Sequence, residues 1–223
     1  MHSYPTQDVN KTLVISGCRF SGNSVGVEDE SSWGGAVLAA GGAINITSTV
    51  FTNNSATFGG AVVLQLAIST IIDSEFTGNY ADQFGGALLQ LSVGSLLVSG
   101  STFDSNVAGE AGGALAVATA SDEDTYTLTN CIFFENSAGG EGGGAVILLV
   151  DTKADSGVNV EDSEIGTMTL KNSLFESNSA DRYGSNINIM CGNVVIDGAY
   201  SIDTGDETDF TITPSFENCS SLV

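Results

Sequence analysis

Carboxylates are concentrated near the end of the sequence, where four of them surround Gly205. Carboxylate oxygens are preferred ligands of Ca²⁺. Asp203, Asp206 and Asp209 are therefore candidate calcium ligands, and Ca²⁺ is the one candidate cofactor. Their spacing matches neither an EF-hand loop nor a glycine-aspartate nonapeptide. A solvated acidic segment is the simpler interpretation.

Catalytic chemistry has few candidates. His2 is the only histidine, so the serine and cysteine residues lack a histidine base. The five cationic side chains, which a uronate lyase would gather around an acidic sugar, are scattered along the chain. Glycoside hydrolysis needs two carboxylates about 5 to 9.5 Å apart in one groove, yet the acids gather in inserted segments at 25–32, 120–125 and 151–166. We therefore expect no enzyme and assign no catalytic residue.

The charge of the chain restricts its partners. The 27 acidic and 5 basic side chains give a formal net charge of −22, which disfavours nucleic acid, anionic membrane surfaces and acidic polysaccharides. The sequence has no apolar run of about 18 residues, so no membrane insertion is expected. The first residues lack the basic and apolar regions of a signal peptide. The chain is therefore cytosolic, already processed, or a piece of a longer protein.

A repeat organises most of the chain. A phenylalanine followed three residues later by an asparagine occurs at Phe20/Asn23, Phe51/Asn54, Phe76/Asn79, Phe103/Asn106, Phe133/Asn136 and Phe175/Asn178. A Gly-Gly-Ala step follows each pair, beginning at Gly34, Gly59, Gly85, Gly112 and Gly143, with a degenerate copy at Gly184. The phenylalanines lie 25 to 42 residues apart, which defines six units with insertions of varying length.

Each unit contains three short stretches with strand patterns and no helical period. The residues seven and five positions before the phenylalanine are mostly apolar, as at Leu13 and Ile15, which is the two-residue period of a strand. Another apolar stretch follows each Gly-Gly step. This arrangement suits a parallel β-helix, in which each strand pairs with its equivalent ~4.8 Å away in the next coil. We expect the phenylalanines to form an internal column, the asparagines a hydrogen-bonded ladder, and the Gly-Gly steps tight corners.

The paired FxxN and GGA[ILV] signatures resemble the repeats of the polymorphic outer membrane protein family of chlamydiae, over about Leu13 to Met190. The resemblance implies a right-handed β-helix at a cell surface, extracellular, acting as an adhesin or structural module. We accordingly expect an all-β fold with one domain over residues 1–223, a right-handed parallel β-helix of about seven coils with three short strands each. Six repeats lie between 13 and 190, and 191–223 forms a degenerate last coil and an acidic segment.

The strand after each Gly-Gly step is apolar at almost every position, although only one of its faces can point inward. We expect the other face to form an outer apolar sheet that contacts another protein chain or an adjoining domain, with self-association as the simplest case. The residues assigned to this partner face are Val37, Val62, Leu88, Leu115 and Val146. Two alternatives remain: the opposite parity, with Val63 and Leu89 outside, and coverage by inserted loops of the same chain.

The function that we expect is a non-catalytic structural or adhesive module that binds a protein through this face. The alternative is a carbohydrate-binding or carbohydrate-cleaving β-helix, which an exposed groove with paired carboxylates and aromatic rings would favour.

The cysteines fall into two pairs. Cys191 and Cys219 are separated by about one coil and are candidates for a disulfide in an oxidising compartment. Cys18 and Cys131 occupy the same position four coils apart, so both are expected to be free, buried thiols. The glycosylation pattern, which matters only if a eukaryote secretes the chain, occurs at Asn10, Asn45, Asn53 and Asn218.

Overall fold

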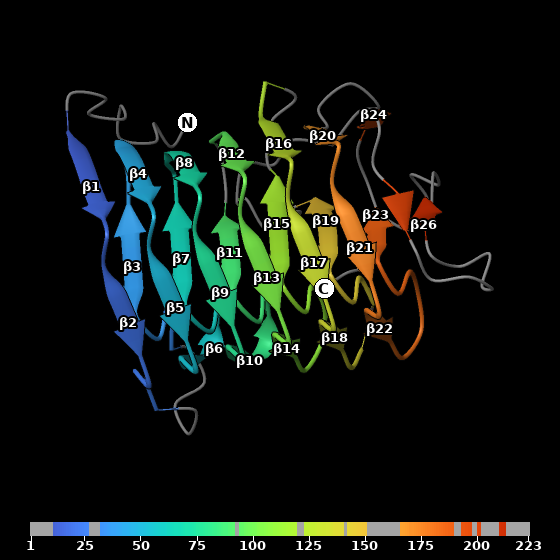
Figure 1. The fold of residues 1–223 in the computed structure, drawn as a ribbon, viewed down its shortest axis with the longest axis horizontal. Coiled ribbons are helices and arrows are strands. Elements are labelled where there is room, and N and C mark those ends of the chain that lie inside the picture. Colours follow the sequence, from blue (N-terminus) through green and yellow to red (C-terminus); the bar gives the residue numbers. More distant parts are fainter. Residues whose placement is uncertain are drawn as a thin grey trace, which may run out of the picture.

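The computed structural model describes residues 11–26, 32–91, 94–119, 123–140, 142–150, 166–189, 193–197, 200–201 and 210–212. All regular structure within these ranges is β-strand. The strands wind around one axis, and each pairs in parallel with its equivalent in the neighbouring coils (Figure 1). The predicted all-β parallel solenoid is confirmed. It differs from the expectation in one respect, because a fourth short strand in most coils gives four sheets instead of three.

The first sheet, which we call the threonine sheet, lies before the phenylalanine of each unit. Burial alternates along its strands: in β4, Ile44 and Ile46 point inward and Asn45 points outward. The strands, in spatial order, are β1 (Thr12–Ser16), β4 (Ala43–Thr47), β8 (Ile68–Ile72), β12 (Leu96–Ser99), β16 (Thr125–Thr129), β20 (Thr167–Lys171) and β24 (Asn193–Asp197).

The second sheet, the phenylalanine sheet, holds the aromatic column of the core. Successive phenylalanine rings are nearly parallel, with centroids 4.8 to 5.0 Å apart from Phe20 to Phe175. Its strands are β2 (Arg19–Ser21), β5 (Val50–Thr52), β9 (Glu75–Thr77), β13 (Thr102–Asp104), β17 (Ile132–Phe134), β21 (Leu174–Glu176) and β25 (Tyr200–Ser201).

Two further sheets complete the coil. The short alanine sheet follows each ladder asparagine from Asn54 onward. It contains β6 (Ser55–Phe58), β10 (Tyr80–Phe84), β14 (Val107–Ala108), β18 (Ser137–Ala138) and β22 (Ser179–Ala180). The Gly-Gly sheet runs behind the first two sheets in Figure 1 and contains β3 (Val37–Ala40), β7 (Val62–Gln65), β11 (Leu88–Leu91), β15 (Leu115–Thr119), β19 (Val146–Val150), β23 (Ile187–Ile189) and β26 (Phe210–Ile212).

The corners between sheets are stacked residues in the left-handed backbone region. Asn, Asp, Ser and Gly enter this region at low cost, and they supply most of the corners. The non-glycine members with positive φ on either side of the phenylalanine sheet are Ser48, Asn53, Asp73, Ser105, Asn130, Glu135, Asn172 and Ser177. Small polar residues at these positions therefore let the chain turn without interrupting the stack.

The two glycines of each Gly-Gly step are required for different reasons. Gly59 has a φ of 58°, a conformation that favours glycine. Gly60 does not, but a methyl group on its Cα would overlap the carbonyl oxygens of Gly86 and Tyr80 in the next coil. The degenerate last step accepts Ser185 in the second position because, within the described residues, no further Gly-Gly step stacks on it.

The asparagines form a continuous ladder. The Oδ1 atom of Asn54 accepts hydrogen bonds from the backbone N–H and the Nδ2 of Asn23, at 3.0 and 2.8 Å. Asn54 Nδ2 in turn donates to Asn79 Oδ1 at 3.0 Å and to the carbonyl of Phe20 at 3.1 Å. Each buried amide thus satisfies its own turn and the neighbouring coil.

The same pattern continues through the later coils. Asn136 is fully buried, and its Oδ1 accepts hydrogen bonds from the backbone N–H and the Nδ2 of Asn106, each 3.0 Å long. Asn136 Nδ2 donates at 2.9 Å to Asn178 Oδ1 and to the carbonyl of Phe103. The ladder leaves this pattern after Asn178, whose Nδ2 donates to Asn186 Oδ1, only eight residues further along the chain.

A second ladder joins the residues two positions before each phenylalanine. The Ser74 hydroxyl accepts the N–H of Thr49 and donates to the carbonyl of Ile72. The same two bonds recur at Thr49 and Ser173. Ser, Thr and Cys thus occupy this position in successive coils.

Candidate functional site

The residues assigned to the structural ladders line the core, except in the first coil. Phe20 is half-buried and Asn23 is exposed, so these two do not belong to the interior as expected. The reason is that no described coil stacks on their outer side. The others are buried: Phe51, Phe76, Phe103, Phe133, Phe175, Asn54, Asn79, Asn106, Asn136 and Asn178. Burial and mutual hydrogen bonding make the asparagines structural groups rather than ligands.

The residues assigned to the partner face lie inside the β-helix. Val62, Leu88, Leu115 and Val146 are fully buried in the main core, and Val37 packs against it from the first coil. Their assignment to a partner-facing surface is therefore wrong. The strands after the Gly-Gly steps are apolar on both faces, so the sequence pattern contains no alternation that could fix which face points inward.

The opposite face of the Gly-Gly sheet is also covered. Val63, Leu89, Ala116 and Ile147 point outward and are 0 to 2% exposed, because they form a second apolar cluster. The cluster is completed by the residues that directly precede the Gly-Gly steps, namely Trp33, Phe58, Phe84 and Ala111, with Leu91 and Leu149. Residues of the chain at the corner thus cover this face. The inserted segments, which were the alternative cover, lie mostly outside the described residues.

The aromatic residues of this cover form a row outside the β-helix. The ring centroids of Trp33 and Phe58 are 4.4 Å apart, and those of Phe58 and Phe84 are 6.2 Å apart, with the rings close to parallel. Stacking occupies both faces of Phe58. Sugar rings are recognised on the open faces of aromatic rings, so this row offers little of what a carbohydrate platform requires.

The outer face of the threonine sheet is open and almost uncharged. Its strands place hydroxyl side chains outward, as at Thr70, Thr127 and Thr169, with isolated aliphatic residues among them. Equivalent residues are in register from β1 to β24. The middle row of this face consists of Val14, Asn45, Thr70, Leu97, Thr127, Thr169 and Val195.

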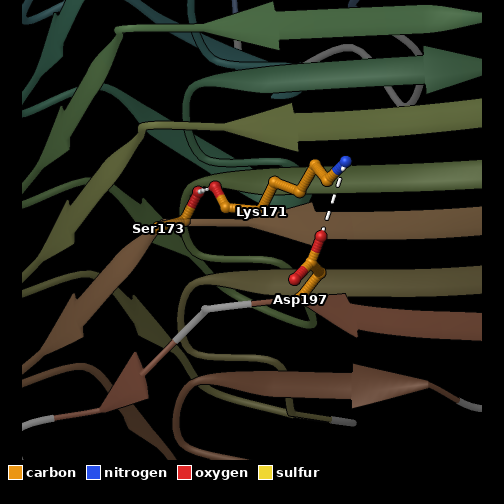
Figure 2. A network of polar contacts seen from close by, with 3 residues as sticks. All are labelled: Lys171, Ser173 and Asp197. Carbon is orange, nitrogen blue, oxygen red and sulfur yellow. Dashed lines mark hydrogen bonds and ion pairs between the residues drawn. The ribbon is translucent and has the colours of Figure 1, made fainter.

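The seven strands of this sheet contain two charged residues, and these pair with each other. Lys171 Nζ lies 3.5 Å from Asp197 Oδ2, the residue at the same position in the next coil (Figure 2). Ser173 donates a 2.9 Å hydrogen bond to the Lys171 carbonyl at the adjoining corner. An exposed ion pair of this kind contributes only about 0 to 1 kcal/mol to stability. Its larger effect is that the formal charge of the outer face is zero.

The neighbouring phenylalanine sheet shows the contrast. Its outward positions carry Arg19, Glu75, Asp104 and Glu176. In a chain with a net charge of −22, the described strands of the threonine sheet thus expose a single carboxylate, that of the paired Asp197. The described strands of the Gly-Gly sheet also lack charge, but their outer face is largely covered. Removing water from Thr, Ser and short aliphatic side chains costs less free energy than removing it from carboxylates.

The dimensions of the face limit the contact that it can make. Its seven strands at ~4.8 Å, each up to five residues long at ~3.3 Å per residue, give roughly 29 by 16 Å. That area, on the order of 450 Å², is below the ~800 Å² per partner of a standard protein interface. A single contact through it is accordingly weak, and repeated contacts are needed for firm attachment.

Other predicted sites are placed only in part. Asn45 lies on the outer face of the threonine sheet, and Asn53 is exposed at a corner with a φ of 52°. The calcium candidates Asp203, Asp206 and Asp209, the disulfide candidates Cys191 and Cys219, and the glycosylation candidates Asn10 and Asn218 lie outside the described residues. Within the described ranges, no group of three or more His, Cys, Asp or Glu side chains is arranged to hold a metal ion.

The two thiols of the repeat differ. Cys131 is buried, and its burial raises the pKa of the thiol to about 11. Cys18 is exposed, which corrects the expectation that both thiols are buried. The reason is that Cys18 belongs to the first described coil, which has a described neighbour on one side only.

One buried polar pair was missed by the sequence analysis. Asp124, in the inserted segment 120–125, is 3% exposed, and its Oδ1 accepts a 2.8 Å hydrogen bond from the Gly94 N–H. Its Oδ2 accepts a 3.3 Å bond from the hydroxyl of Tyr126, a core residue. The available signal was Tyr126 itself, because a tyrosine in an inward column of mostly aliphatic residues needs a partner for its hydroxyl.

No helix within the described residues could span a membrane. Comparison with curated proteins and with solved structures finds no match. The family model of the right-handed β-helix region matches residues 6–210, which include nearly all of the strands described above. The chain therefore belongs to the right-handed β-helix family.

Proposed function

We propose that the chain is a non-catalytic structural or adhesive module, located outside the cell or on its surface, that binds another protein chain or an adjoining domain through the outer face of the threonine sheet. The observation that carries the proposal is that this face, within the described strands, is exposed and has no net charge, in a chain with a net charge of −22. The resemblance of the FxxN and GGA repeats to those of the polymorphic outer membrane protein family supports the location and the adhesive role.

The physical argument rests on dehydration. A partner that covers the threonine sheet displaces water from hydroxyls and methyl groups, which costs much less than displacing it from carboxylates. Hydroxyls such as those of Thr127 and Thr169 can exchange water for hydrogen-bonding groups of the partner. The acidic surface elsewhere repels most macromolecules of the same sign. Among the exposed faces, contact is thereby favoured at the threonine sheet.

The test uses beads coated with the intact chain, retained under flow on surfaces coated with collagen, fibronectin, serum albumin, cellulose or pectin. The wild type is expected to be retained on at least one of the protein surfaces. The double variant Leu97→Asp, Thr127→Asp places two carboxylates in the middle row and should reduce retention at least tenfold. Thr102→Asp, an outward position of the phenylalanine sheet with similar exposure, is the matched control and should retain the wild-type level.

Two outcomes would reject the proposal. One is equal retention of the double variant and the wild type, since the binding face must then lie elsewhere. The other is retention on cellulose or pectin alone accompanied by the release of reducing sugars, which would favour the carbohydrate-active alternative. Circular dichroism of each variant verifies that the β-helix has remained folded.

A further inference from the structure

The described strands of the β-helix end in an edge strand on both sides of each long sheet. Among the described strands, β1, β2 and β3 are first in their sheets, and β24, β25 and β26 are last. An edge strand offers a row of backbone N–H and C=O groups to which another strand can add. Within the described residues, each end of the solenoid therefore presents three templates for strand pairing in a fixed spatial arrangement.

The apolar columns of the core reach the surface at these ends. Leu13 is 43% exposed, whereas Ile44, its equivalent in the next coil, is 1% exposed. At the other end Ile196 is 44% exposed, whereas its equivalent Leu170 is fully buried. Apolar area exposed at a fixed position in this way is typical of a contact site.

The two ends match each other in register. The pairing of β20 with β24 continues the same columns that begin in β1. Adding one more coil after β24 would place the next copy's Leu13, Val14 and Ile15 against Val194, Val195 and Ile196. All three positions then bring an apolar residue against an apolar residue, including Val14 and Val195, which are 62 and 49% exposed.

The charges at the two ends favour head-to-tail over head-to-head stacking. The described strands of the first coil carry Arg19 and no carboxylate, whereas β24 carries Asp197 and its paired Lys171 lies one coil further in. Stacking two first coils against each other would bring two Arg19 side chains to one interface and would make the strand pairing antiparallel. The head-to-tail arrangement avoids both.

We infer that a second copy of the chain stacks head to tail, with β24 of one copy pairing in parallel with β1 of the next. Such an interface is heterologous, so it produces open filaments in which the β-helix axis continues from one copy to the next. The net charge of each copy opposes association at low ionic strength, and salt screens that repulsion. This contact uses the edge strands at the ends of the solenoid, whereas the test of partner binding above uses Leu97 and Thr127 in the middle of the threonine sheet. Val14 and Val195 belong to the same outward row of that sheet.

The experiment combines sedimentation velocity with negative-stain electron microscopy. The wild type is expected to form linear assemblies whose mean length increases as NaCl rises to about 1 M, where the screening length is ~3 Å. Val14→Asp blocks the first coil and Val195→Asp blocks the last. Each variant alone should remain monomeric, whereas their equimolar mixture should form dimers and nothing longer, because one competent end survives in each.

Leu97→Asp is the matched control, since Leu97 belongs to the same outward row but lies in the middle of the solenoid. It should assemble like the wild type even if it loses the partner binding proposed above, so the two proposals can fail separately. Head-to-tail stacking would be excluded if the wild type stayed monomeric at all salt concentrations. It would equally be excluded if Val14→Asp and Val195→Asp assembled as the wild type does while folded.

Discussion

The Oδ1 atom of Asn79 accepts two hydrogen bonds from Asn54, one from its backbone N–H and one from its Nδ2, each 3.0 Å long. The Nδ2 of Asn79 donates to the carbonyl of Phe51 and to Asn106 Oδ1. One fully buried side chain thus connects three coils.

Replacing Asn79 by Ala should destabilise the protein by about 1 to 3 kcal/mol for each buried partner left unsatisfied. Asn23→Ala is the matched control, because Asn23 is exposed at the first rung and its loss leaves less polar surface buried without a partner. Urea unfolding followed by circular dichroism measures both changes. Similar losses for the two variants would mean that the ladder contributes no stability beyond a local turn.

The Gly-Gly corner gives a second prediction. Gly60→Ala should destabilise severely or prevent folding, since its methyl group would overlap backbone carbonyls of the next coil. Gly17→Ala should cost only about 1 kcal/mol, because Gly17 has a positive φ but open space around its Cα. Thermal unfolding of the two variants compares steric overlap with backbone strain. A smaller loss for Gly60→Ala than for Gly17→Ala would contradict the stated role of the second glycine.

The two thiols of the repeat should differ in reactivity. At pH 8, iodoacetamide should alkylate Cys18 at least tenfold faster than Cys131, because burial both shields the Cys131 thiol and raises its pKa to about 11. The rate at Cys131 should continue to rise well above pH 9. Peptide mapping by mass spectrometry assigns the label to each site, and Cys18→Ser verifies the assignment. Equal rates at pH 8 would show that the fifth coil opens readily.

The raised pKa of Cys131 also makes the stability of the folded state depend on pH. The folded state holds the proton more tightly than the unfolded state, whose thiol has a pKa near 9. The stabilisation of the folded state by the protonated Cys131 thiol is therefore complete below about pH 9 and is lost as the pH rises towards 11. The free energy of unfolding, measured by urea titration, should decrease less between pH 8 and pH 10.5 for Cys131→Ser than for the wild type. An identical decrease would assign the alkaline sensitivity to other groups.

The covered outer face of the Gly-Gly sheet can be tested with a pair of residues in one row. Val63 and Leu38 are strand partners, but Val63 is fully buried and Leu38 is 56% exposed. Val63→Lys should destabilise by about 3 kcal/mol or more, because it buries an unpaired charge. Leu38→Lys should remain within about 0.5 kcal/mol of the wild type. Equal, small effects in chemical denaturation would show that the aromatic row does not cover the sheet.

The sequence alone indicated the solenoid because the interior of a β-helix is built from repeated positions. The spacing of residues such as Phe76 and Asn79 placed them in equivalent coils, and these are residues that stack in the structure. The short alanine sheet escaped prediction, since several of its strands are only two residues long, too short to show a period of two.

The candidate site was harder to predict. An alternating strand reveals its inward face, but Val62 and Val63 are both apolar because both faces of the Gly-Gly sheet are packed. A usable signal was present in Trp33, Phe58 and Phe84, each directly before a Gly-Gly step. Only the three-dimensional path of the corner shows that these rings turn back over the outer face. The sequence contains the outward Thr and Ser residues of the threonine sheet, but these residue types at strand positions match no catalytic or ligand-binding motif. They were therefore not predicted as a site.

The stacking of each coil on its immediate neighbours alone has a consequence for how the chain unfolds. Phe103 stacks on Phe76 and Phe133, and the asparagine ladder has the same nearest-neighbour form, as in the bonds of Asn106 to Asn79 and Asn136. The total stability is then approximately the sum of the intrinsic terms of the coils and the coupling terms between adjacent coils. Each terminal coil lacks one coupling term, so thermal motion should open the molecule from its ends inward. A defect in a central coil would instead divide the solenoid into two shorter blocks that melt at separate temperatures.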